Sequence, residues 1–260
     1  YMHVAASKKT GVCLPTFEEY PNRLSPDKLV YFKPDNADFS YTSSDLINFF
    51  DQKEIDQLLV INPDNPSGNL LSKAELLSLL EWSKQKSIRL LIDESFLDFA
   101  RTDDSLSLLD TQTLRDNPQL VVIKSISKSY GVPGLRLGFL ASGDTQLIQQ
   151  LKREVSIWNI NSFAEFYMQI FIKYREDYKR ARAKFVDERT RFLQQLKQID
   201  CLRVIPSAAN YFLCEVAAGQ TAESICSTLL TRFNILLKDC SKKAGFEGKQ
   251  YIRIAIRNTE

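Results

Sequence analysis

The chain has 260 residues, of which 44% are hydrophobic and 25% charged, with a formal net charge of +2. This length can bury a full core and suits one large domain with or without a small appended one, and the near-neutral charge argues against nucleic acid or an anionic membrane as partner. No stretch approaches the length of a membrane span, and none resembles a signal peptide, so no membrane partner is expected.

The cysteine and histidine content narrows the chemistry. The five cysteines are odd in number, scattered and never in Cys-x-x-Cys spacing, which argues against disulfides and a zinc site. A reducing, cytoplasmic location is therefore expected. The one histidine, His3, stands at the start of the chain, so histidine base catalysis is nearly excluded and no metal is expected. Any catalysis must rely on lysine, carboxylates or a cofactor.

The first hundred residues alternate predicted strands with predicted helices. We expect the tail of a helix over residues 1–9, a short buried strand over residues 11–15 and a short helix over residues 44–50. The apolar run of residues 58–61 predicts a buried, parallel strand followed by a tight turn. A capping box followed by leucines at helical spacing predicts a helix over residues 73–86.

Polar side chains follow three of the predicted strands. Asp93 directly follows the predicted strand over residues 88–92, and Lys128 follows the one over residues 120–123. Asn65 follows the earlier predicted strand over residues 58–61. Strands that alternate with helices form a parallel sheet covered on both faces, and ligands bind outside the carboxyl ends of such strands. We therefore expect Asn65, Asp93 and Lys128 to converge on one crevice.

Lys128 lies in a hydroxyl-rich turn between two apolar runs. The second run, residues 137–141, is expected to form another buried strand. Burial at such a turn would lower the pKa of the lysine towards that of a nucleophilic amine, which can form a Schiff base. A solvated loop lysine is the ordinary alternative for an isolated Ser-x-Ser-Lys motif. The three converging polar groups outweigh that alternative.

The second half of the chain predicts a linker and a small α+β domain. Residues 144–157 and 161–200 have helical patterns, and the second stretch is dense in charge and is expected to link two domains. The elements expected after it are strands over residues 202–205, 211–216 and 251–256 and a helix over residues 221–233. On the last strand, Arg253 and Arg257 share the face opposite the isoleucines. Without other support, such a pair is more often surface than site.

Four motifs now stand in order along the chain. They are Asn65-Pro66-Ser67-Gly68, Asp93-Glu94-Ser95-Phe96, Ser125-x-Ser127-Lys128 with Arg136 eight residues on, and Arg253. Each is weak alone, but together they resemble the pyridoxal-phosphate enzymes of aminotransferase class I/II, in the branch of histidinol-phosphate aminotransferases and threonine-phosphate decarboxylases. The resemblance runs from about Gly11 to the last residue.

The resemblance implies an α/β fold in which a mostly parallel sheet is sandwiched by helices, plus a small C-terminal α+β domain. The expected division is a large cofactor-binding domain over residues 1–157, incomplete at its N-terminus, connecting helices over residues 158–200 and the small domain over residues 201–260. The cofactor implied is pyridoxal 5'-phosphate. The implied partners are a small-molecule amino substrate and, in a full-length parent, a second copy in a homodimer.

The resemblance also implies a role for each matching side chain. Lys128 would hold the cofactor as a Schiff base and shuttle the substrate Cα proton, and Asp93 would pair with the pyridine nitrogen. The remaining implied contacts are Asn65 with the ring 3-oxygen, Phe17 stacked on the ring, Ser125 and Arg136 with the cofactor phosphate, and Arg253 with the substrate carboxylate. Simple packing is the alternative for Phe17.

Three departures from the family pattern stand out. A long N-terminal segment of the family, including a Gly-Ala-Thr loop that cradles the phosphate, has no counterpart here. The chain also stops at Glu260 where the family continues, so we expect it to be a piece of a longer chain. Phe96 stands where transaminases of this branch usually have tyrosine.

The function expected first is that of a histidinol-phosphate aminotransferase-like enzyme, with a threonine-phosphate decarboxylase-like enzyme second by a narrow margin. Phe96 favours the decarboxylase, as does Lys238, which precedes Asp-Cys and would meet a substrate phosphate. For one position, a neutral packing variant in a transaminase carries about even weight.

Two alternatives belong to other classes. A Ser-Lys acyl enzyme fits Ser-x-x-Lys at Ser125 and Lys128, but its Ser-Asp-Asn and Lys-Thr-Gly partners are missing. A non-catalytic fragment would keep the fold and, without the phosphate loop, bind no cofactor.

Overall fold

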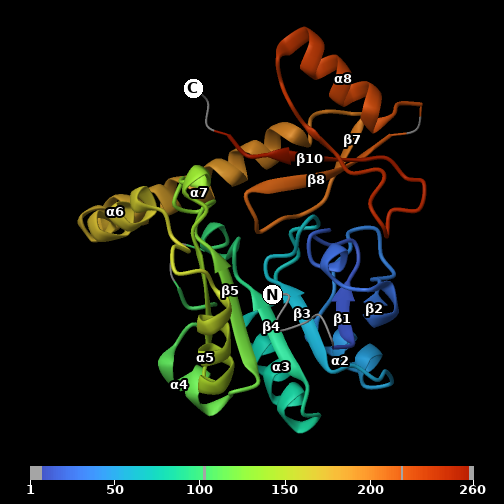
Figure 1. The fold of residues 1–260 in the computed structure, drawn as a ribbon. Helices are drawn as coiled ribbons and strands as arrows, with labels where there is room; N and C mark the ends of the chain where they lie inside the picture. Colours follow the sequence, from blue (N-terminus) through green and yellow to red (C-terminus); the bar gives the residue numbers. More distant parts are fainter. Residues whose placement is uncertain (1–7, 102–103, 218, 258–260) are drawn as a thin grey trace.

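The computed structural model describes residues 8–101, 104–217 and 219–257. The helix expected over residues 1–9 lies almost entirely outside them. Within the described part, none of the helices is long and apolar enough to cross a membrane. The strands fall into two sheets, one in each half of the chain (Figure 1).

The large sheet has six strands in the order β2-β1-β3-β4-β5-β6. The first five in that order run parallel, and β6 is antiparallel to β5. The strands are β1 (Thr10–Cys13), β2 (Leu29–Phe32), β3 (Gln57–Ile61), β4 (Arg89–Asp93), β5 (Leu120–Ser125) and β6 (Gly138–Ser142). The expected mostly parallel sheet is therefore confirmed.

Helices cover both faces of this sheet. They are α2 (Ser43–Phe50), α3 (Lys73–Gln85), α4 (Thr111–Asp116) and α5 (Thr145–Glu154), with short 3-10 turns η1 (Pro21–Arg23), η2 (Pro26–Lys28), η3 (Leu97–Phe99) and η4 (Pro133–Leu135). Capping boxes at Thr42 and Ser72 start α2 and α3. Each such cap stabilises its helix by about 1 kcal/mol.

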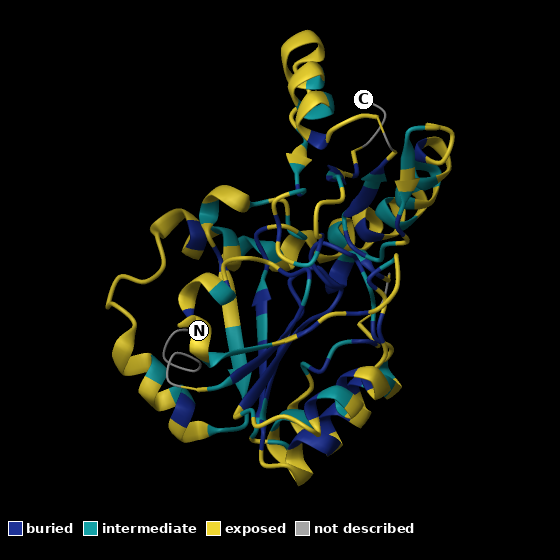
Figure 2. Cartoon of the chain, turned by 90° about the vertical axis from the view of Figure 1, so that its right-hand side faces the viewer, coloured by how far each residue is buried: buried dark blue, intermediate teal, exposed yellow. Residues whose placement is uncertain are grey.

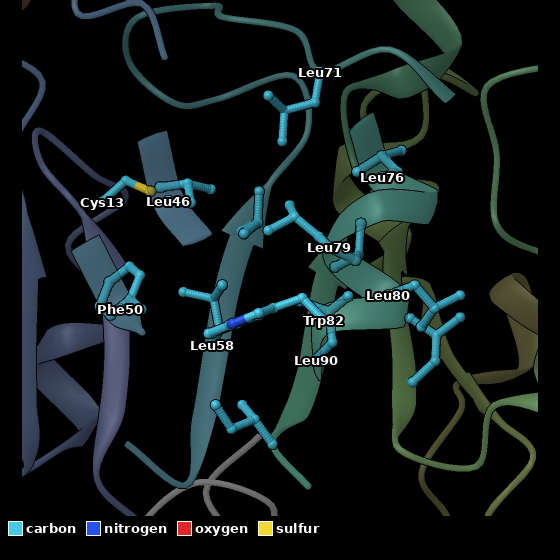
Figure 3. Packing of buried hydrophobic residues seen from close by; sticks show 14 of the residues in the cluster. Cys13, Leu46, Phe50, Leu58, Leu71, Leu76, Leu79, Leu80, Trp82 and Leu90 are labelled. Atoms are coloured by element: carbon cyan, nitrogen blue, oxygen red, sulfur yellow. The ribbon is translucent and has the colours of Figure 1, made fainter. Parts of the chain in front are cut away.

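The larger of the two cores lies between the sheet and helices α2 and α3. Leu76 and Leu79 of α3 point at Leu58 of β3 and Leu90 of β4, and all four are fully buried (Figure 3). Each side chain of this kind contributes about 1.5–3 kcal/mol by leaving water. Phe50 of α2 closes the same core beside β1. The central strands are buried on both faces, whereas the outer helix faces are exposed (Figure 2).

The strand expected to be buried over residues 137–141 is not. Leu137 itself is buried, but β6 begins with two exposed residues, Gly138 and Phe139, and the rest of the strand is half-buried. The reason is its position: β6 is the edge strand and pairs with β5 alone among the described strands. An apolar run therefore predicted the strand correctly but not its burial.

The connecting region is two helices. They are α6 (Ser162–Phe171) and α7 (Arg175–Leu196), joined by the 3-10 turn η5 (Ile172–Tyr174). In Figure 1, α7 runs along the boundary between the two sheets, whereas α6 projects away from them at the left. Ile157, Trp158 and Phe163, before and within α6, are 91%, 90% and 78% exposed. Exposed apolar surface of this kind is typical of protein–protein contacts. The homodimer expected from the sequence stays a prediction.

The small sheet is antiparallel, in the order β7-β8-β10-β9. Its elements are β7 (Leu202–Val204), β8 (Tyr211–Val216), α8 (Ala222–Phe233), β9 (Lys238–Asp239) and β10 (Tyr251–Ala255). Ile252, Ile254 and Ile256 pack into its core, as expected. The domain boundaries at residues 157 and 200 stay predictions.

Candidate active site

A pocket of 630 Å³ opens at the carboxyl ends of β3, β4 and β5. The structure brings Asn65, Asp93 and Lys128 together in its wall, as the strand ends predicted. The other side chains of the wall that the sequence singled out are Phe17, Phe96, Ser125 and Arg136. The pocket therefore collects polar groups from several separate segments at one edge of a rigid sheet.

Lys128 is carried by a tight turn that follows β5. The turn is held by backbone hydrogen bonds from Tyr130 N to Ile126 O (3.0 Å) and from Val132 N to Ser127 O (3.0 Å). The Lys128 side chain is reached by solvent from the pocket, and its Nζ lies 3.7 Å from the centroid of the Phe96 ring and 5.8 Å from that of Phe17. The ammonium group therefore faces aromatic rings on two sides.

This environment lowers the pKa of Lys128 to about 8. Burial among protein atoms is the largest cause, because it disfavours the charged form. Asp93 opposes the shift, whereas the positive charges of Arg253 and Arg136 add to it. Near neutral pH a useful fraction of Lys128 is thus the neutral, nucleophilic amine.

We expect the reactivity of Lys128 towards amine reagents to rise about tenfold per pH unit and to level off above its pKa of about 8. The sign follows because the neutral amine reacts and it becomes the majority form above that pKa. Competitive labelling across a pH series, with mass spectrometry of the Lys128 peptide, measures the midpoint. A midpoint near the ordinary lysine value of about 10.4 would contradict the lowered pKa.

Asp93 is the last residue of β4 and is buried at the base of the pocket. Its Oδ1 accepts a hydrogen bond from Ser95 N (2.8 Å), and its Oδ2 accepts one from Tyr20 OH (2.5 Å). The carboxylate is thus oriented from two sides. Tyr20 was missed by sequence reasoning: it stands in the loop after β1, 73 residues from Asp93, and its three-residue spacing from Phe17 was the one available signal.

Asn65 connects the segment after β3 of the large sheet to β10 of the small sheet. Its Oδ1 accepts a hydrogen bond from Arg253 Nη1 (2.7 Å) on β10, and the Arg253 guanidinium lies 4.9 Å from the Tyr211 ring centroid. The Tyr211 hydroxyl in turn donates to Asp64 O (2.7 Å). Arg253 of β10 is not among the residues that line the pocket, but this hydrogen bond places its guanidinium next to Asn65 of the wall. Its expected contact with a substrate carboxylate stays a prediction.

Arg257 does not share that position. It lies beyond the end of β10, exposed, and lines a separate pocket beside Glu188 of α7. The expected shared strand face of Arg253 and Arg257 is wrong because β10 ends at Ala255. Arg257 is a surface residue, as the ordinary alternative for such arginines predicted.

Ser125 and Arg136 both line the pocket. Ser125 is the last residue of β5, and its backbone N–H donates to Ser95 Oγ (2.9 Å). Arg136 has a left-handed backbone (φ 55°), and no carboxylate pairs with it among the described residues. Its guanidinium is thus available to an anion. The Ser127 hydroxyl, by contrast, donates a hydrogen bond to Leu137 O (3.1 Å) and so stabilises the turn.

Lys238 is outside the pocket wall. It is exposed on β9, directly opposite Arg253 in the β9–β10 register. Paired residues of antiparallel strands point to the same face, so Lys238 projects from the same side of the small sheet as Arg253. It adds positive charge near the site without lining it.

The site combines a nucleophilic lysine, an oriented buried carboxylate and an arginine that has no carboxylate partner among the described residues, all at one sheet edge. These groups suit pyridoxal phosphate. The sequence model of aminotransferase class I and II matches residues 4–260. The chain therefore belongs to the aminotransferase class I and II family, whose members depend on pyridoxal phosphate. The family expected from the four motifs is confirmed.

Individual relatives point to two reactions. The chain is 33% identical over 262 residues to the L-serine phosphate decarboxylase of Sulfurospirillum multivorans, covering 97% of this chain and 65% of that protein. It is 30% identical to the threonine-phosphate decarboxylase of Salmonella typhimurium, covering 79% of this chain and 54% of that protein. The chain thus spans about two thirds or less of the length of these relatives.

One solved structure represents the other reaction. The histidinol-phosphate aminotransferase from Clostridium acetobutylicum superposes with a TM-score of 0.84 at 25% identity, covering 97% of this chain and 74% of that one. The fold is thereby confirmed as that of the pyridoxal-phosphate aminotransferases. The Ser-Lys acyl-enzyme alternative loses its support, because Ser125 ends a strand in a chain of this family.

Proposed function

We propose that this protein is a pyridoxal-phosphate decarboxylase of phosphorylated hydroxy amino acids, of the phosphoserine and phosphothreonine type. The observation that carries the proposal is Phe96, whose ring face lies 3.7 Å from Lys128 Nζ and offers no hydroxyl there. The relatives of 33% and 30% identity support it, since both are decarboxylases of phosphorylated amino acids. This reverses the narrow preference for transamination that we expected from the sequence.

The residues present fit the cofactor. Arg136 and Ser125 would hold its phosphate, Phe17 would cover its ring, and Asp93, oriented by Tyr20, would face its pyridine nitrogen. When bound, pyridoxal phosphate supplies an electron sink for the pair released as a bond to the substrate Cα breaks.

The chain's own side chains then decide which bond that is. Arg253 would orient the substrate carboxylate by charge-assisted hydrogen bonds, so that the bond from Cα to the carboxylate breaks and carbon dioxide leaves. Lys128 Nζ would give a proton to Cα, which balances the reaction as amino acid plus proton to amine plus carbon dioxide. Lys238, on the same face as Arg253, would meet the substrate phosphate.

Transamination is the second candidate. The superposition on the histidinol-phosphate aminotransferase favours it, because the two share the whole described fold. In that case Phe96 would be a packing variant, and Lys128 Nζ would take the proton from the substrate Cα.

The test supplies the protein and pyridoxal phosphate with phosphoserine, with phosphothreonine, and with histidinol phosphate plus 2-oxoglutarate. We expect carbon dioxide release from a phosphorylated hydroxy amino acid without glutamate formation. Unphosphorylated serine and threonine are the matched controls and should react far more slowly. Glutamate formation without carbon dioxide would establish transamination instead, and failure to retain the cofactor at all would favour the non-catalytic fragment.

A further inference from the structure

A buried ion pair lies behind the turn that carries Lys128. Asp98 belongs to η3, five residues after Asp93, and is 4% exposed. Its Oδ1 accepts a hydrogen bond from Lys124 Nζ (2.7 Å) on β5, and both side chains are almost fully buried. An ion pair is seldom buried so deeply unless further polar groups surround it.

Two hydroxyls surround the same carboxylate. Burial alone would raise the pKa of Asp98, but the Lys124 charge and the Ser129 and Tyr178 hydroxyls together lower it, so the carboxylate stays ionised. Asp98 Oδ2, Ser129 Oγ and Tyr178 OH are shielded from solvent, and none has a hydrogen bond of normal geometry to another atom of the described chain. The two hydroxyls therefore have no competing partner that would draw them from Asp98.

This cluster brackets the lysine of the active site. Lys124 and Ser129 lie four residues before and one residue after Lys128, and both contact Asp98. Lys124 lines the cofactor pocket as well as a second cavity of 690 Å³ that also contains Asp98 and Tyr178. One carboxylate thus contacts both ends of the segment from which Lys128 projects.

The cluster also contacts the helix that leads to the small domain. Tyr178 is on α7, and one turn later Arg182 donates to Asp98 O (3.2 Å) and to Asp104 Oδ1 (2.7 Å). The Tyr130 ring, two residues after Lys128, lies edge-on to that of Tyr178 with centroids 4.6 Å apart. The lysine turn, η3 and α7 therefore meet at Asp98.

We propose that Asp98 is a positioning residue for Lys128: through Lys124 and Ser129 it fixes the lysine turn against α7 and keeps the amine in its place over the Phe96 ring. This inference rests on the proposed role of Lys128. Asp98 does not line the cofactor pocket, so its effect must pass through the turn.

The test measures the pH midpoint of Lys128 labelling by an amine reagent in the cofactor-free chain, in Asp98→Asn and Ser129→Ala. A loosened turn moves the Lys128 amine away from the protein atoms that lower its pKa, so we expect the midpoint to rise from about 8 by roughly one pH unit, with about tenfold slower labelling at neutral pH. The direct charge effect has the opposite sign, because losing the Asp98 charge would lower the pKa of a lysine. Asp93, Arg253 and Arg136, the charged groups facing Lys128, are unchanged in both variants.

Asp104→Asn is the matched control, because Asp104 pairs with Arg182 of α7, as the cluster does, but its side chain is largely exposed and among the described residues its hydrogen bond goes to Arg182, not to Lys124 or Ser129. Its midpoint should stay that of the parent. An unchanged or lowered midpoint in folded Asp98→Asn and Ser129→Ala would overturn the proposal. If Asp98→Asn does not fold by circular dichroism, Ser129→Ala and Tyr178→Phe decide it alone. Capture of pyridoxal phosphate by Lys128 is scored separately, so the proposed function can fail without affecting this result.

Discussion

Replacing Lys128 with alanine is expected to abolish covalent capture of pyridoxal phosphate and to lower turnover by about 10²–10⁴-fold, the usual contribution of a general acid–base group. No other lysine of the pocket wall can substitute for it. Lys124 also lines the pocket, but its Nζ donates a hydrogen bond to Asp98 Oδ1 (2.7 Å) in a buried ion pair. Borohydride reduction with the cofactor, followed by peptide mapping, locates the label.

Lys128→Arg is the matched variant, since it keeps a positive charge beside Phe96 but removes the amine that forms the covalent bond. It should retain the fold and fail to trap the cofactor. A borohydride label on Lys124 or Lys238 in the parent chain would show that the lysine has been assigned wrongly.

Asp93→Asn should keep the fold and lose most turnover, by about 10²-fold or more, in a protein that binds the cofactor. The loss follows because an amide cannot stabilise a protonated pyridine nitrogen as a carboxylate does. The fold should change by no more than about 1 kcal/mol, since asparagine can still accept from Ser95 N and the Tyr20 hydroxyl can turn to accept. Thermal unfolding and single-turnover rates measure the two effects.

The control for this variant is Asp110→Asn. Asp110 caps α4 by accepting from Thr113 N (2.8 Å), and asparagine caps a helix equally well. Asp110→Asn should therefore leave both the thermal unfolding and the single-turnover rate unchanged. Full turnover in Asp93→Asn would mean that Asp93 only orders the turn at Ser95.

The sequence predicted the large sheet and the position of its site because both depend on local patterns. Buried parallel strands are continuous apolar runs, and residues 58–61 and 120–123 show this without ambiguity. The rule that ligands bind at carboxyl ends then placed Asn65, Asp93 and Lys128 at one edge before any contact was known.

What the sequence could not supply was contact between distant side chains. Tyr20 and Asp93 are 73 residues apart and Lys124 and Asp98 are 26 apart, and neither pair has a spacing that repeats along the chain. The exposure of Phe139 depends on which strand lies at the sheet edge, and apolar composition does not encode that order. The roles of the site residues stay predictions until the variants are measured.

The Asn65 side-chain amide accepts a hydrogen bond from Arg253. In the proposed enzyme, this contact links the site of the cofactor to the site of the substrate. In the proposed function, Asn65 would contact the cofactor and Arg253 would contact the substrate carboxylate. A substrate that draws the guanidinium towards itself must change the hydrogen bonding of Asn65, and a bound cofactor must change that of Arg253. Because such coupling is reciprocal, the factor by which bound substrate changes the affinity for cofactor should equal the factor by which bound cofactor changes the affinity for substrate.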